Sequence, residues 1–361
     1  MATTSYPVNH PLAVKLWSRK LFHDVIGESF WGRFMGEGTD SMIQLKSETS
    51  KGPGDRIRVG LRALLTGDGV QGDATLEGNE EGLATYYDDV VINQIRHAVR
   101  SDGKMSEQRV PFSVREEARM GLKDWWTERL EVTLANQLTG YTDQSDTRYT
   151  GNQATIAPTA STRIVCGGGK ALESSLSAST DHSIMLTDLD RAVTIAKTAV
   201  SGTRERIRPV NVDGKRYYVV FLHPYQIQRL RADASTAGNF FDVNKAILQG
   251  GKISDNPIIT RASFIYGECI VHEWSYLPTV TAVAPTGSTA NFRRGVLCGA
   301  QAAVLAVGQD SSPNKMSWNE ELFDYKNQLG VSSGMIFGLK KTVFNSVDFG
   351  TIVLSGYAPA P

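Results

Sequence analysis

The chain has 361 residues, of which 41% are hydrophobic and 21% are charged, a composition typical of a globular protein with a sizeable core. Its 38 lysines and arginines balance 38 aspartates and glutamates, which argues against a dedicated nucleic-acid binder. The three cysteines lie far apart in the sequence and no run of 18 apolar residues occurs, so neither a disulfide framework nor a membrane span is expected.

Residues 1–50 begin with a short amphipathic pattern and continue into a cluster of large apolar side chains. Trp31 and Phe34 stand in this cluster, among glycines. Aromatic side chains of this size need a surface to pack on, which is either the core of their own chain or a neighbouring subunit. We favour the second alternative and expect intersubunit contacts at Trp31 and Phe34.

Two strand-like runs flank a stretch rich in glycine and acidic residues. Residues 55–65 alternate apolar side chains with Arg56, Arg58 and Arg62, which predicts a half-buried strand with a basic outer face. Residues 85–101 alternate in a similar way. The two runs together predict a long two-stranded excursion with a flexible, glycine-rich end.

The charges of this excursion are segregated. From Gln71 to Asp89 the chain has six acidic residues and no lysine or arginine. These acids are Asp73, Glu77, Glu80, Glu81, Asp88 and Asp89. They form either a solvated loop or an acidic end that lies against a basic surface of the next copy. Under the second interpretation, the residues that contact another subunit are Arg56, Arg58, Arg62, Asp73, Glu77, Glu80 and Glu81.

The clearest element is a long amphipathic helix over residues 111–139. Apolar side chains recur every three to four residues, and charged side chains occupy the opposite face. Ser113 and Glu116 have the spacing of a capping box, and Gly140 follows the last helical residue. At 1.5 Å per residue the helix is about 40 Å long.

The rest of the chain mixes helices and strands. Residues 140–186 are rich in threonine, serine and glycine, and we expect an irregular insertion there. Residues 187–200 predict a helix with Thr187 as its N-cap, and residues 217–224 predict a buried strand. Strands are expected again near the end of the chain.

Motifs associated with catalysis lack the context that they require. Residues 67–72 satisfy G-x-G-x-x-G, but no helical pattern follows to hold a phosphate, and acidic residues gather there instead. Residues 330–334 satisfy G-x-S-x-G, but no histidine follows His272. The six histidines show no metal-ligand spacing. We therefore expect no catalytic residue, no cofactor and no metal site.

Three segments carry a resemblance to a known family. They are residues 111–138, residues 217–233 and a C-terminal W-x-E-x-x-F-D-Y segment formed by Trp318, Glu320, Phe323, Asp324 and Tyr325. With the order of the predicted elements, they resemble the major capsid proteins of tailed bacteriophages, in particular the podovirus-type family. The resemblance covers nearly the whole chain except about 140–186, and its motifs are specific only in combination.

The resemblance implies the α+β capsid fold and a division of the chain. Residues 1–50 would be the N-arm and residues 51–105 the E-loop. The P-domain would span 106–186, with the spine helix at 111–139 and the insertion at 140–186. The A-domain would span 187–315, and the strands of 316–361 would return to the P-domain.

The resemblance also implies a structural protein and not an enzyme. Hexamers and pentamers would form an icosahedral shell around double-stranded DNA, with portal and scaffold or decoration proteins as further partners. The protein would reside in the virion capsid after assembly in the host cytoplasm. Two alternatives stay open, a nanocompartment shell of the same fold around a cargo enzyme, and a nucleotide-dependent enzyme that uses residues 67–72.

Overall fold

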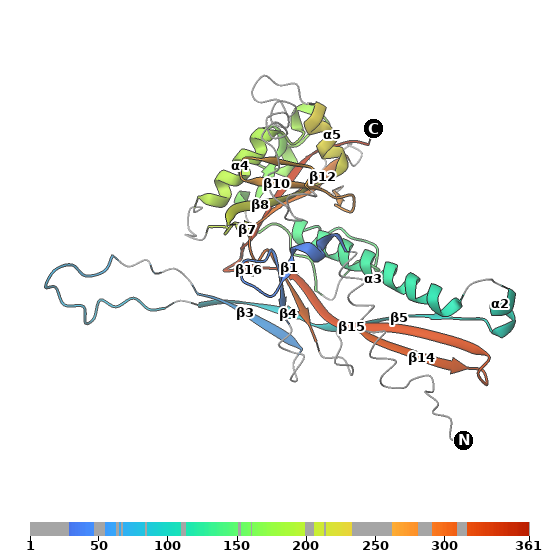
Figure 1. Ribbon diagram of the computed structural model, residues 1–361. Helices are drawn as coiled ribbons and strands as arrows, with labels where there is room; N and C mark the ends of the chain where they lie inside the picture. Colours follow the sequence, from blue (N-terminus) through green and yellow to red (C-terminus); the bar gives the residue numbers. More distant parts are fainter. Residues whose placement is uncertain are drawn as a thin grey trace.

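Two large β-sheets organise the molecule (Figure 1). The structure is a computed structural model. It describes residues 29–46, 55–62, 65, 68–83, 85–109, 113–150, 153–159, 161–198, 206–212, 214–232, 262–280, 291–308 and 316–360. Expectations for the first 28 residues lie outside these described residues.

The first sheet has six strands, and its central member is β15 (Gln328–Lys341), the longest strand described. The order is β1 (Met35–Gly36), β2 (Ile43–Lys46), β13 (Ala303–Val307), β15 and β14 (Ser317–Phe323). The strand β5 (Asn93–Arg100) also pairs with β15, antiparallel, from Gly330 to Phe337. α2 (Lys104–Arg109) follows β5 at the far end of this sheet (Figure 1).

The second sheet has eight strands and lies beside the first. Its main order is β6 (Ile164–Cys166), β18 (Thr351–Tyr357), β12 (Phe292–Cys298), β8 (Lys215–Leu222), β10 (Cys269–Glu273) and β9 (Phe264–Tyr266). β11 (Thr279–Val280) pairs with β12, and β7 (Val210–Val212) pairs with β8. α4 (Leu186–Lys197) and α5 (Pro224–Ala232) pack on one face of this sheet through a shared apolar cluster.

Two short pairs and several single turns complete the described elements. β3 (Arg56–Arg62) and β4 (Thr85–Val91) form an antiparallel hairpin, and β16 (Val343–Phe344) pairs with β17 (Val347–Asp348). The expected strand over 85–101 is therefore two strands that meet at Ile92, of which only β4 belongs to the hairpin. The 3-10 turns are η1 (Phe30–Phe34), η3 (Ser161–Arg163), η4 (Gly167–Gly169), η5 (Glu173–Ser175) and η6 (Thr180–His182).

The helix α3 (Val114–Thr139) joins the two sheets into one core. Its apolar face packs on the six-stranded sheet, where the ring centroids of Trp126 and Phe337 are 6.1 Å apart. From Leu130 to Thr139 every residue is buried, so the expected polar face exists only in the first half of the helix. Gly140 ends α3 with φ of +62°, a left-handed conformation that favours glycine.

One expected helix start is confirmed in position and the other is wrong. Ser113 is the N-cap of α3 as expected, but its side chain makes no capping hydrogen bond, so the expected capping box with Glu116 is absent. α4 begins at Leu186 and not after Thr187, because the Asp188 carboxylate accepts the backbone N–H of Met185 at 3.0 Å. A carboxylate can satisfy a free N–H at a helix start from inside the first turn.

Several strands lie in a sheet other than the one that their place in the sequence suggested. β13 falls in the range expected for the A-domain but belongs to the six-stranded sheet. β5 falls in the range expected for the E-loop and belongs to the same sheet. β6, from the expected insertion, and β18, from the expected return to the P-domain, join the eight-stranded sheet. These pairings join segments far apart in sequence, which local periodicity does not encode.

Candidate assembly surfaces

The β3–β4 hairpin lies on the six-stranded sheet through its apolar face. Ile57 and Val90 are paired across the hairpin and are almost fully buried, and they pack against Val304 and Ala306 of β13. Because side chains of a strand alternate between faces, Arg56, Arg58 and Arg62 point away from this contact and are exposed. The basic outer face expected from the sequence is therefore present.

A buried ion pair anchors the hairpin to β15. The Lys340 Nζ donates to the Asp88 carboxylate and, at 3.1 Å, to the carbonyl oxygen of Asp89. The backbone N–H of Val343 donates to the second Asp88 oxygen at 3.0 Å. Asp88 therefore has a structural role that the sequence interpretation missed, although its place two residues before apolar Val90, on the same face of the strand, was a usable signal.

The neighbouring acid, Asp89, points outward and pairs with Arg58. Two hydrogen bonds of 2.7 and 2.9 Å join the guanidinium to the carboxylate, and the same guanidinium lies 4.2 Å from the ring centroid of Tyr87. The hydrogen bond from Arg58 lowers the pKa of Asp89, and in return raises the pKa of Arg58. Arg58 thus forms an ion pair within its own hairpin, whereas Arg56 and Arg62 form no ion pair with another described residue.

Residues 68–83, which we call the acidic tip, extend away from the body beyond the hairpin (Figure 1). Apart from half-buried Val70, every residue of the acidic tip is exposed. The expected contact residues Asp73, Glu77, Glu80 and Glu81 all lie in it, and Leu76 and Leu83 expose 60% of their surface.

Trp31 and Phe34 are the main correction among the expected contact residues. They are 1% and 4% exposed, inside the core of their own chain. The Trp31 ring lies 4.4 Å from the ring of Phe221 on β8 and 4.5 Å from that of Trp274, and Phe34 lies 5.2 Å from Phe221. With so little surface left, these two side chains are not available to a neighbouring subunit.

The C-terminal motif connects the far end of the six-stranded sheet to α3. The indole Nε1 of Trp318 donates to Glu320 Oε1 at 2.8 Å, and Arg115 Nε of α3 donates to the same oxygen at 2.8 Å. Asp324, Tyr325 and Lys326 form the turn into β15 with φ between +49° and +69°. Tyr325 is fully exposed there. The W-x-E part of the motif is therefore structural, and its D-Y part is at the surface.

Within the described residues, the motifs associated with catalysis lack the structural context that they need. No helix occurs in residues 68–83 after the glycine motif, and no group of three metal-ligating side chains is present in the described ranges. The G-x-S-x-G residues lie inside β15 and not at a strand-to-helix turn. Within the same ranges, no helix has the length and apolarity needed to cross a membrane.

The three cysteines and His223 are buried. All three cysteines are free and buried, and burial raises the pKa of the Cys166 and Cys269 thiols to about 12. Burial, helped by Arg293, lowers the pKa of His223 to about 4. At neutral pH these two thiols and the imidazole are therefore in their uncharged forms.

Comparison with solved structures identifies the class of fold as the phage capsid fold of the HK97-like type. The structure of the capsid of Ralstonia phage GP4 matches with a TM-score of 0.79 and 30% identity, over 100% of this chain and 99% of that chain. The capsid of cyanophage Pam1 matches with a TM-score of 0.72 and 22% identity, over 93% and 94% of the two chains. The expected α+β capsid fold is confirmed.

Sequence comparison then gives the family. Residues 5–360 match the phage capsid protein family, and the chain belongs to that family. It is 27% identical to the major capsid protein of Pseudomonas phage KPP25 over 362 residues, which cover 93% of both chains. The protein is a structural protein of a phage shell and self-associates in the virion capsid. These matches lend no support to the nanocompartment and nucleotide-enzyme alternatives.

Proposed function

We propose that the chain forms hexamers and pentamers that tile an icosahedral shell around double-stranded DNA. The observation that carries the proposal is the acidic tip. This segment projects from a folded body and has exposed leucines and acidic side chains but no lysine or arginine. Such a segment gains a partner only in an assembly, and head-to-tail contacts between copies generate closed rings. The zero net charge suits a wall that meets DNA without binding it tightly.

In this proposal each part of the fold takes a role. The β3–β4 hairpin and the acidic tip serve as the E-loop, and α3 is the spine helix of a P-domain built on the six-stranded sheet. The eight-stranded sheet with α4 and α5 serves as the A-domain. Arg56, Arg58 and Arg62 on β3, with Asp73, Glu77, Glu80 and Glu81 in the acidic tip, line contacts with adjacent subunits. A portal and scaffold or decoration proteins join during assembly in the host cytoplasm.

The proposal is tested by deleting residues 67–82. The hairpin is anchored by Ile57, Val90 and the Asp88–Lys340 pair, all outside the deletion, so the variant should fold as a soluble chain. It should fail to form shells when purified protein is imaged by negative-stain electron microscopy. Normal particles from the deleted chain would refute the assignment of the tip as an assembly arm.

A finer test reverses the charges of Glu80 and Glu81 together. Because contacts between exposed charges are screened by salt, the loss of assembly should be greatest at low ionic strength. Light scattering during assembly, measured at several salt concentrations, gives the dependence. Equal assembly of the variant and the natural chain at every salt concentration would remove the electrostatic role of the tip.

A further inference from the structure

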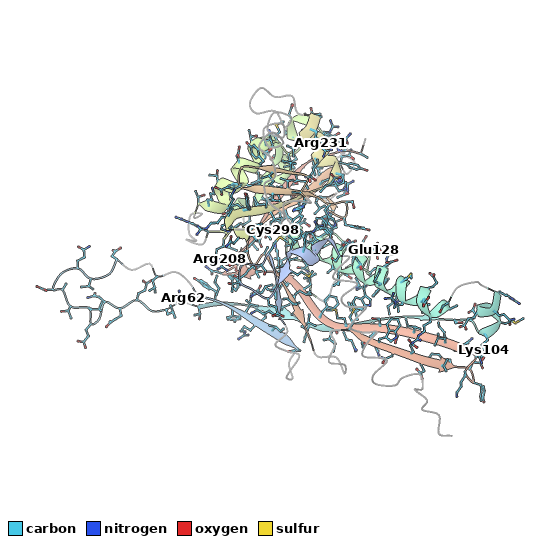
Figure 2. All side chains as sticks on the ribbon, viewed as in Figure 1. Arg62, Lys104, Glu128, Arg208, Arg231 and Cys298 are labelled. Carbon is cyan, nitrogen blue, oxygen red and sulfur yellow. The ribbon has the colours of Figure 1, made fainter. Side chains whose placement is uncertain are left out.

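The C-terminal end of α3 lies where the two large sheets meet (Figure 1). Two short segments of the chain pass from one sheet to the other there, one between β12 and β13 and one between β15 and β18. Backbone hydrogen bonds join these segments, from Gly299 N–H to the Gly350 oxygen at 2.9 Å and from Thr342 N–H to the Ala302 oxygen at 3.1 Å. In Figure 2, Cys298 at the end of β12 lies at this junction. The angle between the two sheets is therefore decided at one place in the subunit.

Arg294 of β12 fastens the eight-stranded sheet to the end of α3. Its buried side chain lies on the α3 side of the sheet, because Val296 and Cys298 on the same face pack in the apolar cluster that includes α3. Nη1 of Arg294 donates to the carbonyl oxygen of Gly140 at 2.9 Å and lies 3.5 Å from that of Thr139. The last carbonyls of a helix have no partner inside the helix, and a cation at this end also complements the helix dipole.

The charge of Arg294 is balanced by Glu173 of η5. Nε and Nη2 of the guanidinium donate to the two carboxylate oxygens at 2.8 and 2.6 Å, and each side chain is only 9% exposed. Together with the bond from Nη1 to α3, this geometry uses all three nitrogens of the guanidinium. A lysine amine has one nitrogen and cannot make these contacts together. The pair therefore fixes one relative position of β12, η5 and α3.

A second cation holds the same helix end from the side of the six-stranded sheet. Lys341, the last residue of β15, is fully buried, and its Nζ lies 2.9 Å from Asp348 Oδ1 and donates to the Ala157 carbonyl oxygen at 3.1 Å. The segment that contains Ala157 packs on Gly140, where an added Cβ atom would come within 2.8 Å of its backbone. Burial lowers the pKa of Lys341, and the charge of nearby Arg294 adds to the lowering. Two cations, one from each sheet, thus meet at the end of α3, each with its own carboxylate.

We propose that the Arg294–Glu173 pair sets the angle between the two sheets and thereby the diameter of the shell. The inference rests on the proposed assembly function and adds to it a positioning residue, Arg294. Because Arg294 and Lys341 carry like charges, loss of the Glu173 charge pushes the eight-stranded sheet away from the helix end. Every copy in a closed shell repeats the same angle, so a small change in each subunit alters the rotation between neighbours at which the shell closes.

Arg294→Lys and Glu173→Gln test the pair while nearly preserving the volume of the side chains. Each should leave a folded chain whose shells, imaged by electron microscopy, have a broader range of diameters than the shells of the natural chain. Arg293→Lys and Glu268→Gln are the matched controls and should give natural shells. Arg293 points to the opposite face of the sheet, toward α5, and Glu268 pairs with Lys197 at the surface. Urea unfolding of each unassembled chain measures its folding stability separately.

The distance between the two sheets is a readout that a purely stabilising contact would not change. The three natural cysteines are buried, so spin labels attached at Arg216→Cys on β8 and Glu321→Cys on β14, both exposed positions, report on the two sheets. Double electron–electron resonance of the unassembled labelled chain should give one narrow distance. Addition of Arg294→Lys should shift or broaden the distance distribution, and addition of Arg293→Lys should not.

The outcomes separate this inference from the proposed function. Natural shell diameters and natural label distances in both Arg294→Lys and Glu173→Gln would overturn the inference and leave the shell function intact. Lower folding stability with natural diameters would overturn it as well, because the pair would then only stabilise the fold. Failure of the natural chain to form shells would overturn the proposed function and the link to shell diameter, and the label distances would still decide whether Arg294 sets the angle.

Discussion

The turn η1 and the acidic tip make an instructive pair, because both have apolar side chains that suggest contacts with another subunit. In η1, Trp31 and Phe34 find aromatic partners on β8 and at Trp274 and are removed from solvent. In the acidic tip, Leu76 and Leu83 find no such partner in their own chain and stay exposed. The difference teaches that apolar side chains in a glycine-rich stretch are buried only where the rest of the chain supplies a surface for them to pack on.

The largest effect that separates the two regions is expected from Trp31→Ala. The change removes a fully buried indole that packs on Phe221 and Trp274, and such truncations cost about 3–5 kcal/mol of folding free energy. Urea unfolding of the unassembled chain measures it. The tip deletion is the control and should leave the unfolding midpoint near that of the natural chain. A loss below about 1 kcal/mol for Trp31→Ala would place η1 outside the core.

A similar but smaller effect is expected at the base of the hairpin from Asp88→Ala. The substitution leaves the buried Lys340 amine without its carboxylate, a change that costs roughly 3 kcal/mol. Hydrogen exchange should show faster exchange of the β3 and β4 amides, because the hairpin loses its anchor. Asp89→Ala, one residue on, removes only an outward-facing carboxylate and should leave this exchange unchanged. Equal effects of the two substitutions would contradict the inward and outward assignment.

The contact between η1 and α3 should also depend on pH through Glu131. This carboxylate accepts the backbone N–H of Phe30 at 2.7 Å, and burial raises its pKa above the ordinary 4.5. The folded state then holds the proton at higher pH than the unfolded state, so folding stability falls as pH rises from 4.5 through the raised pKa. Unfolding measured across this range should show the fall in the natural chain. Glu131→Gln should lack that component, and an unchanged pH profile in the variant would refute it.

The smallest effect on folding is expected from Leu76→Ser in the acidic tip. The side chain is already exposed, so the free energy of unfolding of the single chain should change by less than about 0.5 kcal/mol. Shell yield should nevertheless fall if the acidic tip contacts another copy, as the proposed function requires. A measurable loss of folding stability with normal shells would reverse the comparison with Trp31.

Local pattern was enough to predict some of these elements from the sequence but not others. The period of α3 and the alternation around Ile57 are local, and both predicted elements are present. The place of Trp31 depends on Phe221 and Trp274, nearly 200 residues or more away in the chain, which no local pattern shows. β18 likewise pairs with β12, and only the folded chain brings the two together.

For the expected contact residues, the local composition of the sequence indicated the right segment, but it did not show which way each side chain points. The run from Gln71 to Asp89, which has six acidic residues and no lysine or arginine, overlaps most of the acidic tip. Two of the six, Asp88 and Asp89, lie instead in β4 and point in opposite directions.

The length of β15 has a mechanical consequence for a wall built from this chain. Its 14 residues run along the extended part of the molecule and bond sideways to β14, β5 and β13 (Figure 1). Ladder hydrogen bonds lie across the strands, so a pull along the strand loads many of them at once in shear. A pull across the sheet would peel them one after another. The six-stranded sheet should therefore resist a pull along β15 better than a pull across its strands.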